Sequence, residues 1–288
     1  PEHVFNWLVD FFAGHSHCTI YRGQKSTLQQ ITASIIQGSG VGPAVYIVNA
    51  ADLTAATPGN VMVKFADDTY IIIPAANADS RQTEIDHAER WAGENNLKVN
   101  PAKYNEIVFY DKRRKLRLQL PPPLPGINRT TSVKILGVTV TNSLSVAPHV
   151  HAVVSSGAQT LFALRVLRGH GMDDAPLQTI FRSTAVARLQ YASSAWWGFA
   201  TESERQRINA FIRRSTNAQF VPANLPSFAE LCKAADEALF NNIVRNPQHV
   251  LHNLLPPQTH ASQNYNLRPR KHNFQLPPRT THLIDCNF

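Results

Sequence analysis

The chain has 288 residues, 43% of them hydrophobic, so it is long enough to bury a sizeable core and to hold two domains. Its formal net charge of +8 favours an anionic partner, with nucleic acid first among the candidates. The three cysteines lie far apart, which excludes a disulfide framework and indicates an intracellular setting, in the nucleus or the cytoplasm. No apolar run approaches the roughly 20 residues that cross a membrane, so no membrane partner is expected.

Up to residue 76 the sequence predicts helices and strands in alternation. Apolar residues at helical spacing run up to Gly14, and two strand-like segments follow around a polar turn. Pro43 stands near the first turn of a second helix. The expected elements are a helix at 3–13, strands at 18–23 and 29–36, a break at 37–43, a helix at 44–53, and hairpin strands at 61–65 and 69–73.

The next segment, up to residue 147, continues this mixed pattern. A helix is expected at 77–96, with Asp79 or Ser80 as its cap. A basic cluster, KRRKLR, and a breaker, PPPLPG, separate two of the strands that follow. These segments are strands at 97–100, 106–110 and 132–141, the basic cluster at 112–117, and the breaker at 121–126.

From about residue 148 the apolar period becomes helical, as at Leu161, Leu164 and Leu167. The capping box TESE at 201–204 predicts the start of another helix. The last segment is polar, Pro-rich and basic, which is typical of a chain without a packed core. The predicted fold class is therefore α+β: an antiparallel sheet with helices at 1–147, a mostly helical domain at 148–255, and a disordered basic tail at 256–288.

The stretch KFADDTY places Asp67 and Asp68 side by side between two apolar runs. Adjacent carboxylates repel, and on a straight strand they would point to opposite faces, whereas at a hairpin tip they can converge. An isolated pair of this kind is most often a simple turn. The alternative is a site for divalent metal ions, which prefer carboxylate oxygens together with substrate phosphates.

The segments around this pair carry a family resemblance. SIIQGSGVGPAVYIVNAADL precedes KFADDTY, while NNLKVNPAKYNEIVF and VKILGVTVT follow it. In this order they resemble the successive blocks of a reverse transcriptase palm, and more narrowly those of LINE-type non-LTR retrotransposons. The resemblance extends from residue 1 to about residue 220, and YNLRPRK resembles the tail of such reading frames. It implies an incomplete palm followed by a thumb-like helical domain.

The resemblance also implies roles for individual residues. Asp67 and Asp68 match the pair that binds Mg²⁺ or Mn²⁺ while a primer 3′-hydroxyl attacks a deoxynucleoside triphosphate on an RNA template with a DNA primer. The other matches are Gln37, Gly38 and Ser39 beside the incoming nucleotide and template, Lys103 for the departing pyrophosphate, and Leu136 and Gly137 for the primer end. From the residues alone, the usual interpretations are structural: the glycine-rich segment is a turn before a buried helix, Lys103 is a solvated lysine, and VKILGV is a core strand with a glycine bulge.

The basic cluster at 112–117 is a candidate for contact with nucleic-acid phosphates. Its members are Lys112, Arg113, Arg114, Lys115 and Arg117. A solvated basic run or a nuclear import signal is the alternative.

Two further clusters favour structural interpretations. His15, His17 and Cys18 fit no common zinc spacing and indicate a polar turn. Trp196 and Trp197 are able to stack on bases, but their apolar helical surroundings favour core packing.

The sequence leads to one main hypothesis and two rivals. The main hypothesis is a fragment of an RNA-directed DNA polymerase that polymerises weakly or not at all by itself, because the first aspartate of the family is not assigned to any residue here. One rival is a catalytically dead relic that still binds nucleic acid. The other is a two-metal nuclease of a different fold.

Overall fold

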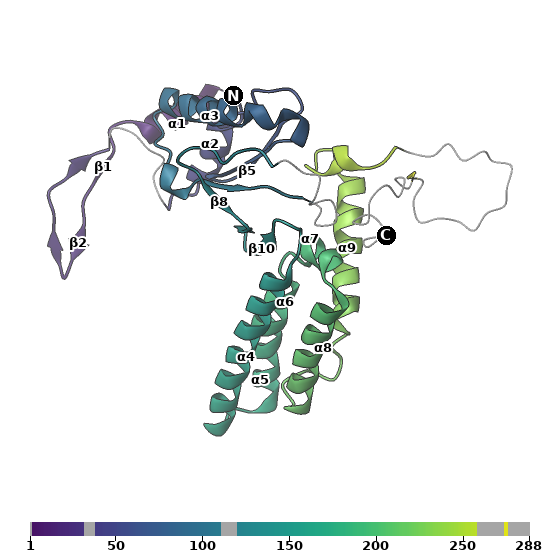
Figure 1. Ribbon diagram of the computed structural model, residues 1–288. Coiled ribbons are helices and arrows are strands. Elements are labelled where there is room, and N and C mark those ends of the chain that lie inside the picture. Colours follow the sequence, from purple (N-terminus) through teal and green to yellow (C-terminus); the bar gives the residue numbers. More distant parts are fainter. Residues whose placement is uncertain (1, 32–37, 111–119, 258–273, 276–288) are drawn as a thin grey trace. The chain divides into compact units, whose positions relative to one another are not determined.

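The computed structural model describes residues 2–31, 38–110, 120–257 and 274–275 (Figure 1). Helices and small antiparallel sheets make up this part, in agreement with the predicted α+β class. The chain divides into two compact units. Unit 1 comprises Pro1–Tyr104 and Pro121–Asn128, and unit 2 comprises Asn105–Leu120 and Arg129–Phe288. The basic cluster at 112–117 and nearly all of the tail lie outside the described residues, and the domain boundary at 147 stays a prediction.

Unit 1 begins with helix α1 (Glu2–Phe12), followed by a long hairpin. The hairpin reverses earlier than the sequence predicts, because Arg22 and Gly23 adopt positive φ angles of 49° and 78° and turn the chain there. Its paired strands are β1 (Ser16–His17) with β4 (Gln29–Gln30), and β2 (Ile20–Tyr21) with β3 (Gln24–Lys25).

The centre of unit 1 is a small core between helices and a second hairpin. Helix α2 (Gly42–Asn49) begins with Pro43 in its first turn, as predicted. Strands β5 (Val61–Phe65) and β6 (Asp68–Ile72) form the predicted hairpin. Their inner face contributes Met62 to a cluster with these residues: Tyr46, Ala50, Leu53, Trp91, Ala92 and Val99.

The helix predicted at 77–96 is shorter than expected. A 3-10 turn, η1 (Ala75–Ser80), precedes α3 (Arg81–Glu94), and neither predicted cap closes the helix with its side chain. Ser80 instead donates its hydroxyl to the Asn77 carbonyl at 2.8 Å. The strand predicted at 97–100 is also wrong, because the chain leaves α3 through Asn96, at a φ of 53°, and runs without strand pairing into η2 (Pro101–Lys103).

The strand predicted at 132–141 is a hairpin in the structure. Leu136 and Gly137 adopt φ angles of 44° and 90°, and this two-residue turn reverses the chain. The prediction failed because it overlooked a change of phase at the turn, where the apolar positions move from odd (Val133, Ile135) to even (Val138, Val140). The strands of this region are β7 (Asn105–Ile107), β8 (Asn128–Thr130), β9 (Ser132–Ile135) and β10 (Val138–Thr141).

Unit 2 is mostly helical, as the sequence predicts, and α4, α5 and α8 pack side by side (Figure 1). The capping box at Thr201 is confirmed, since its side chain and that of Glu204 bind each other's backbone. A second capping box, Ser227 with Glu230, starts α9. The helices are α4 (Ala147–Gly169), α5 (Asp174–Phe181), η4 (Arg182–Val186), α6 (Ala187–Gln190), α7 (Ser193–Trp196), η5 (Trp197–Phe199), α8 (Glu202–Asn217), α9 (Phe228–Arg245) and η6 (His252–Leu254).

The core of unit 2 is built from large apolar side chains. Phe181, Phe211 and Phe220 are fully buried, and Trp196 is buried with them, as core packing of the two tryptophans predicts. Helix α4 has the length and hydropathy of a membrane span, which the sequence reasoning overlooked. One face of this helix, with Val150, Leu161 and Leu164, is buried in the core of unit 2, whereas Phe162 and Val166 are exposed.

Candidate active site

The acid pair lies at the tip of the β5–β6 hairpin. Phe65 pairs with Asp68, so Ala66 and Asp67 form a two-residue loop between the strands. Ala66 has a φ of 50°, a conformation that residues with a Cβ rarely adopt. Both aspartates are exposed. Both the turn interpretation and the metal-site interpretation place the two aspartates at a hairpin tip, and the structure has them there. The loop interrupts the alternation of the strands, and both carboxylates face solvent.

Two tyrosines flank the pair. The Tyr70 hydroxyl donates to Asp68 Oδ2 at 3.5 Å. Burial raises the pKa of Tyr46, on α2, and the negative charge of Asp67 raises it further. This effect of Asp67 on Tyr46 shows that the acid pair lies close to α2 within unit 1. Helix α2 is the helix that follows the glycine-rich segment.

Lys64 fastens the hairpin to the end of α2. Its ammonium donates to the carbonyl oxygen of Leu53 at 2.5 Å and to that of Ala50. Cations are favourable at helix C-termini, where carbonyl groups lack helical partners. Lys64 therefore positions the strand that leads into the acid pair, a role that sequence reasoning missed.

A buried carboxylate holds the other end of β5. Glu84, on α3, is fully buried and accepts the amides of Thr57 at 2.7 Å and Ala56 at 3.0 Å. It also accepts the side-chain amide of Asn60 at 2.8 Å. Burial raises the pKa of Glu84, but these hydrogen bonds outweigh burial, and the pKa lies below its ordinary value of 4.5. Because Asn60 immediately precedes β5, this network fixes where the hairpin begins.

The strained loop leads to a first prediction. Replacing Ala66 with glycine is expected to stabilise the hairpin by about 0.5–1 kcal/mol. Glycine adopts a positive φ without the steric cost of a Cβ, and this gain outweighs the larger conformational entropy that glycine loses on folding. Hydrogen exchange of the β5–β6 amides measures the change. Ala102→Gly, at an exposed position with an ordinary φ, is the control and is expected to destabilise its own region. Faster hydrogen exchange of the β5–β6 amides in Ala66→Gly would contradict the interpretation that Ala66 is strained.

The other predicted residues of unit 1 are placed as follows. Gln37 lies outside the described residues. Gly38 is exposed with a φ of 84°, and the Ser39 hydroxyl accepts the Gly42 amide at 3.0 Å, at the start of α2. Lys103 is exposed at the end of η2, whose first amide is capped by Asn100.

The predicted primer-positioning residues belong to unit 2 and form the β9–β10 turn. Tyr191, which follows α6, donates its hydroxyl to the Leu136 carbonyl at 2.9 Å. Its ring covers Gly137 so closely that a Cβ there would lie 3.0 Å from Tyr191 Cε1. No sequence pattern indicates this contact, which joins residues 55 positions apart. Tyr191 therefore holds the turn in shape.

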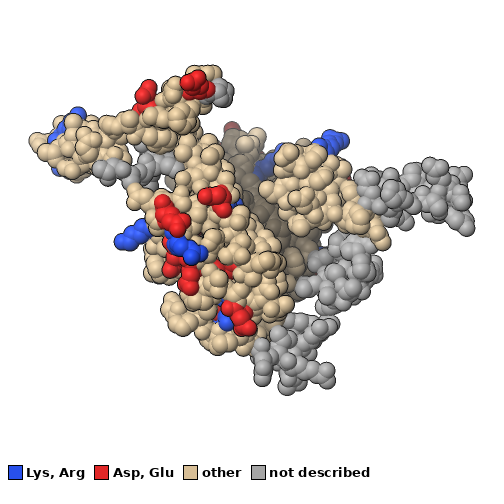
Figure 2. Space-filling view, turned by 90° about the horizontal axis from the view of Figure 1, so that it is seen from above, with Lys and Arg blue, Asp and Glu red and all other residues tan. Residues whose placement is uncertain are grey.

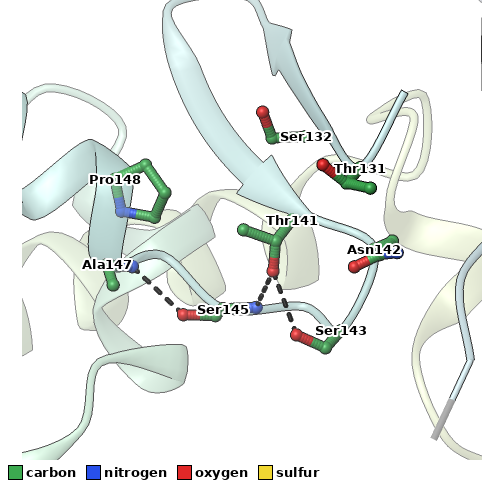
Figure 3. A pocket seen from close by; sticks show the side chains of 8 residues that line it. All are labelled: Thr131, Ser132, Thr141, Asn142, Ser143, Ser145, Ala147 and Pro148. Carbon is green, nitrogen blue, oxygen red and sulfur yellow. Dashed lines mark hydrogen bonds between the residues drawn. The ribbon is translucent and has the colours of Figure 1, made fainter. Parts of the chain in front are cut away.

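A polar hollow of about 390 Å³ lies where β10 leads into α4 (Figure 3). The Thr141 hydroxyl accepts the Ser145 amide at 3.1 Å, and the Ser145 hydroxyl accepts the Ala147 amide at 3.3 Å. These hydroxyls serve the loop and the first turn of α4, so the hollow has a structural explanation. Its lining is Thr131, Ser132, Thr141, Asn142, Ser143, Ser145, Ala147 and Pro148.

Among the described residues seen in Figure 2, Lys and Arg side chains lie in small separate groups, and acidic side chains lie among uncharged residues. The predicted phosphate contacts at 112–117 lie outside the described residues. In the part of the chain that the structure describes, no three His, Cys, Asp or Glu side chains gather in a group that could hold a metal ion. Asp67 and Asp68 are therefore at most a pair of ligands there.

Comparison with known proteins gives one family match. Residues 1–140 match the model of the family described as reverse transcriptase (RNA-dependent DNA polymerase). No solved structure matches the chain significantly. The matched segment contains α1, α2, the acid pair and the β9–β10 turn.

Curated relatives extend the similarity into the helical part. A "Probable RNA-directed DNA polymerase from transposon X-element" of Drosophila melanogaster is 23% identical over 229 residues, or 73% of this chain. The "RNA-directed DNA polymerase from mobile element jockey" of the same species is 25% identical over 186 residues, or 58% of this chain. A "Probable RNA-directed DNA polymerase from transposon BS", also from that species, is 26% identical over 237 residues, or 76% of this chain. The alignments span only 24%, 19% and 26% of these relatives.

Proposed function

We propose that this chain, whose residues 1–140 match the reverse transcriptase (RNA-dependent DNA polymerase) family, is part of a LINE-type enzyme and carries the acid pair of a nucleotidyl-transfer site. The enzyme class expected from this family is an RNA-directed DNA polymerase, with an RNA template and nucleotides as substrates. The observation that carries the proposal is the β5–β6 tip, where a strained two-residue loop presents Asp67 and Asp68 together.

The donor chemistry of the tip suits a divalent cation such as Mg²⁺ or Mn²⁺. Both side chains are exposed carboxylates, and Mg²⁺ is usually held by one or two carboxylates, with water and substrate phosphates completing its shell. A bound cation would stabilise the negative charge that develops on the oxygens of a transferring phosphoryl group. Two protein ligands alone hold a divalent ion weakly, so we propose that this chain polymerises weakly or not at all by itself.

Other residues of the chain would position the substrates. Gly38 and Ser39, with Gln37, would lie beside the nucleotide and template, since glycine lets backbone approach a ligand closely. Lys103 would neutralise charge on departing pyrophosphate. The Leu136–Gly137 turn, which Tyr191 holds in place, would support the primer end.

Metal binding by the 288-residue chain tests the proposal. Asp67→Asn combined with Asp68→Asn is expected to weaken Mn²⁺ binding by at least about tenfold, measured by the electron paramagnetic resonance of free Mn²⁺. The matched control is Asp173→Asn with Asp174→Asn, a second adjacent pair, whose Asp174 forms an ion pair with Arg168 at 2.8 Å. This control removes the same charge and is expected to leave Mn²⁺ binding unchanged. Equal binding by all three proteins would contradict the proposed site.

Primer extension on an RNA template separates the enzyme from its rival. Robust extension that Asp67→Ala abolishes would confirm the site and contradict the weak activity proposed for this chain. A relic instead predicts nucleic-acid binding that is indifferent to Mg²⁺ and to Asp67→Asn, without any extension. Strand cleavage in place of extension would indicate a nuclease.

A further inference from the structure

A histidine is buried in the core of unit 2, against Trp196. His149 lies in the first turn of α4 and is only 4% exposed. Its ring meets the ring of Trp196 edge to face, with 5.1 Å between the ring centroids. The Nε2 atom is buried and has no hydrogen-bond partner among the described residues. One ring nitrogen therefore lacks the partner that buried polar atoms usually have.

A charged ring is unfavourable at this position. Protonation turns both ring nitrogens of histidine into donors, and within the described residues Nε2 of His149 has no acceptor to donate to. The positive end of the α4 dipole lies at the same turn, where it disfavours a cation. Burial lowers the pKa of His149 below its ordinary value of 6.5, and the positive charge of Lys134, on β9, lowers it further. The folded unit therefore favours the neutral ring.

The neighbouring elements supply cations to this part of the core. Lys134 is the one whose charge acts on the pKa of His149. Arg205, on α8, lies over the ring of Trp197, 5.0 Å from its centre, and Arg188, on α6, donates to a serine hydroxyl of α4. Strand β10 and helix α7 carry no ionisable side chain. A proton on His149 would therefore add positive charge to a region that already holds ammonium and guanidinium groups.

The carboxylates of the neighbouring helices are engaged elsewhere. Glu204, on α8, and Glu230, on α9, each accept the backbone amide of the N-cap residue in the two capping boxes. Asp236, on α9, acts on the buried thiol of Cys232, whose pKa is raised to about 11, mainly by burial. Among the described residues, no carboxylate contributes to the pKa of His149. A protonated His149 would thus lack a counter-charge.

Trp196 connects this histidine to the β9–β10 turn. Its indole Nε1 donates to the carbonyl oxygen of Tyr191 at 3.0 Å. The Tyr191 hydroxyl in turn donates to the Leu136 carbonyl, and its ring covers Gly137. Because Trp196 is fully buried, its position depends on the side chains packed against it, and the His149 ring is one of them. A change at His149 therefore reaches the residue that holds the turn.

We propose that His149 makes the shape of the β9–β10 turn sensitive to pH: acid protonates the ring, the ring leaves its place against Trp196, and the hold of Tyr191 on the turn loosens. This inference goes beyond the proposed function, because the turn would respond in this way whether or not it supports a primer. The folded-state pKa of His149 is depressed, so the stabilisation by the neutral ring is fully present above the ordinary pKa of 6.5 and is lost as the pH falls through the folded-state pKa.

Hydrogen exchange of the β9–β10 amides in the 288-residue chain tests this proposal, with rates corrected for the intrinsic pH dependence of exchange. Between about pH 7.5 and about pH 5.5 the protection of these amides is expected to fall about fivefold. His149→Phe keeps an aromatic ring that cannot take up a proton, so it is expected to abolish the fall. The matched control is His151→Phe, at an exposed histidine of the same helix, which is expected to retain the fall.

Lys134→Gln is a second test, which leaves the histidine in place and does not depend on the folding of His149→Phe. Removing this charge brings the pKa of His149 closer to 6.5, so the fall in protection is expected to be smaller and to be complete at a higher pH. A fall as large as that of the parent chain would contradict the effect of Lys134 and overturn the proposal.

Two further results would overturn the proposal. An equal fall in His149→Phe and in the parent chain would assign the pH response to other groups. Protection that rises in acid would show that a cation–π attraction between the protonated ring and Trp196 outweighs the cost of burial. A fall confined to the amides of α4, with the β9–β10 turn unchanged, would disprove the connection through Trp196. Circular dichroism at neutral pH establishes that each variant is folded.

Discussion

Glu84→Leu lowers the opening free energy of the β5–β6 hairpin by about 3 kcal/mol, because it removes the acceptor that a fully buried carboxylate offers to three hydrogen-bond donors. These donors are the amides of Ala56 and Thr57 and the side chain of Asn60. Hydrogen exchange of the β5 amides is the measurement, since Asn60 immediately precedes this strand. The acid pair follows at the far end of the same strand, so Mn²⁺ binding is expected to weaken as well. Unchanged exchange would show that the network does not hold the hairpin.

The isosteric variant Glu84→Gln isolates the charge. It retains an oxygen that can accept from Thr57 and Asn60, as Oε1 does, but turns its NH2 donor towards the Ala56 amide, from which Oε2 accepts, so an intermediate loss of about 2 kcal/mol is expected. Because the folded-state pKa of Glu84 is depressed, its stabilisation is fully present above its ordinary pKa of 4.5 and is lost as the pH falls through the lower, folded-state pKa. Glu84→Gln is therefore expected to flatten the acid dependence of β5 exchange. A pH profile identical to that of the parent chain would contradict this assignment.

Gly137→Ala destabilises unit 2 by about 1–3 kcal/mol. Two effects contribute, and the same substitution at a second glycine distinguishes them. At a φ of 90° a Cβ is strained, and at this position it would also lie 3.0 Å from the Tyr191 ring. Gly171 has the same φ of 90° but nothing within 4 Å of its added Cβ. The unfolding free energy of Gly171→Ala therefore reports backbone strain alone, and the excess loss in Gly137→Ala reports the ring contact.

A double-mutant cycle checks that interpretation. Adding Tyr191→Ala to Gly137→Ala is expected to recover the excess loss, because the ring that the Cβ would strike has been removed. Tyr191→Phe keeps the ring and removes only the 2.9 Å hydrogen bond to Leu136, at a cost of about 1 kcal/mol. Additive losses for Gly137→Ala and Tyr191→Ala would contradict the proposed hold on the turn.

The sequence pattern predicted correctly those elements that depend on residues close together in the chain. The β5–β6 hairpin, Pro43 at the start of α2 and the capping box at Thr201 all depend on residues within a few positions of one another. The break at Leu136–Gly137 was missed because apolar residues alternate on both sides of it, although the alternation shifts by one residue at the turn and the glycine marks the reversal. The predicted cap at Ser80 failed because its hydroxyl serves the Asn77 carbonyl and the Asn60 side chain instead of α3.

The supporting residues of the candidate site could not be found from sequence. Glu84 lies 24 positions from Asn60, Tyr191 lies 55 positions from Leu136, and no spacing rule connects such pairs. Lys64 was visible beside the acid pair, but its role depends on the carbonyl groups of Ala50 and Leu53. Sequence therefore locates the acid pair, and tertiary structure identifies what holds it.

The absence of lysine from residues 147–220 determines which chemical modifications can reach this helical segment. Acetylation acts on ammonium groups, so it is unable to switch off the positive field of these helices, and guanidinium groups keep their protons even in strongly alkaline buffer. Amine-reactive dyes and cross-linkers would likewise spare residues 147–220 and react with exposed lysines elsewhere, such as Lys103 in unit 1. A fluorophore can thus be attached through a lysine without modifying these helices.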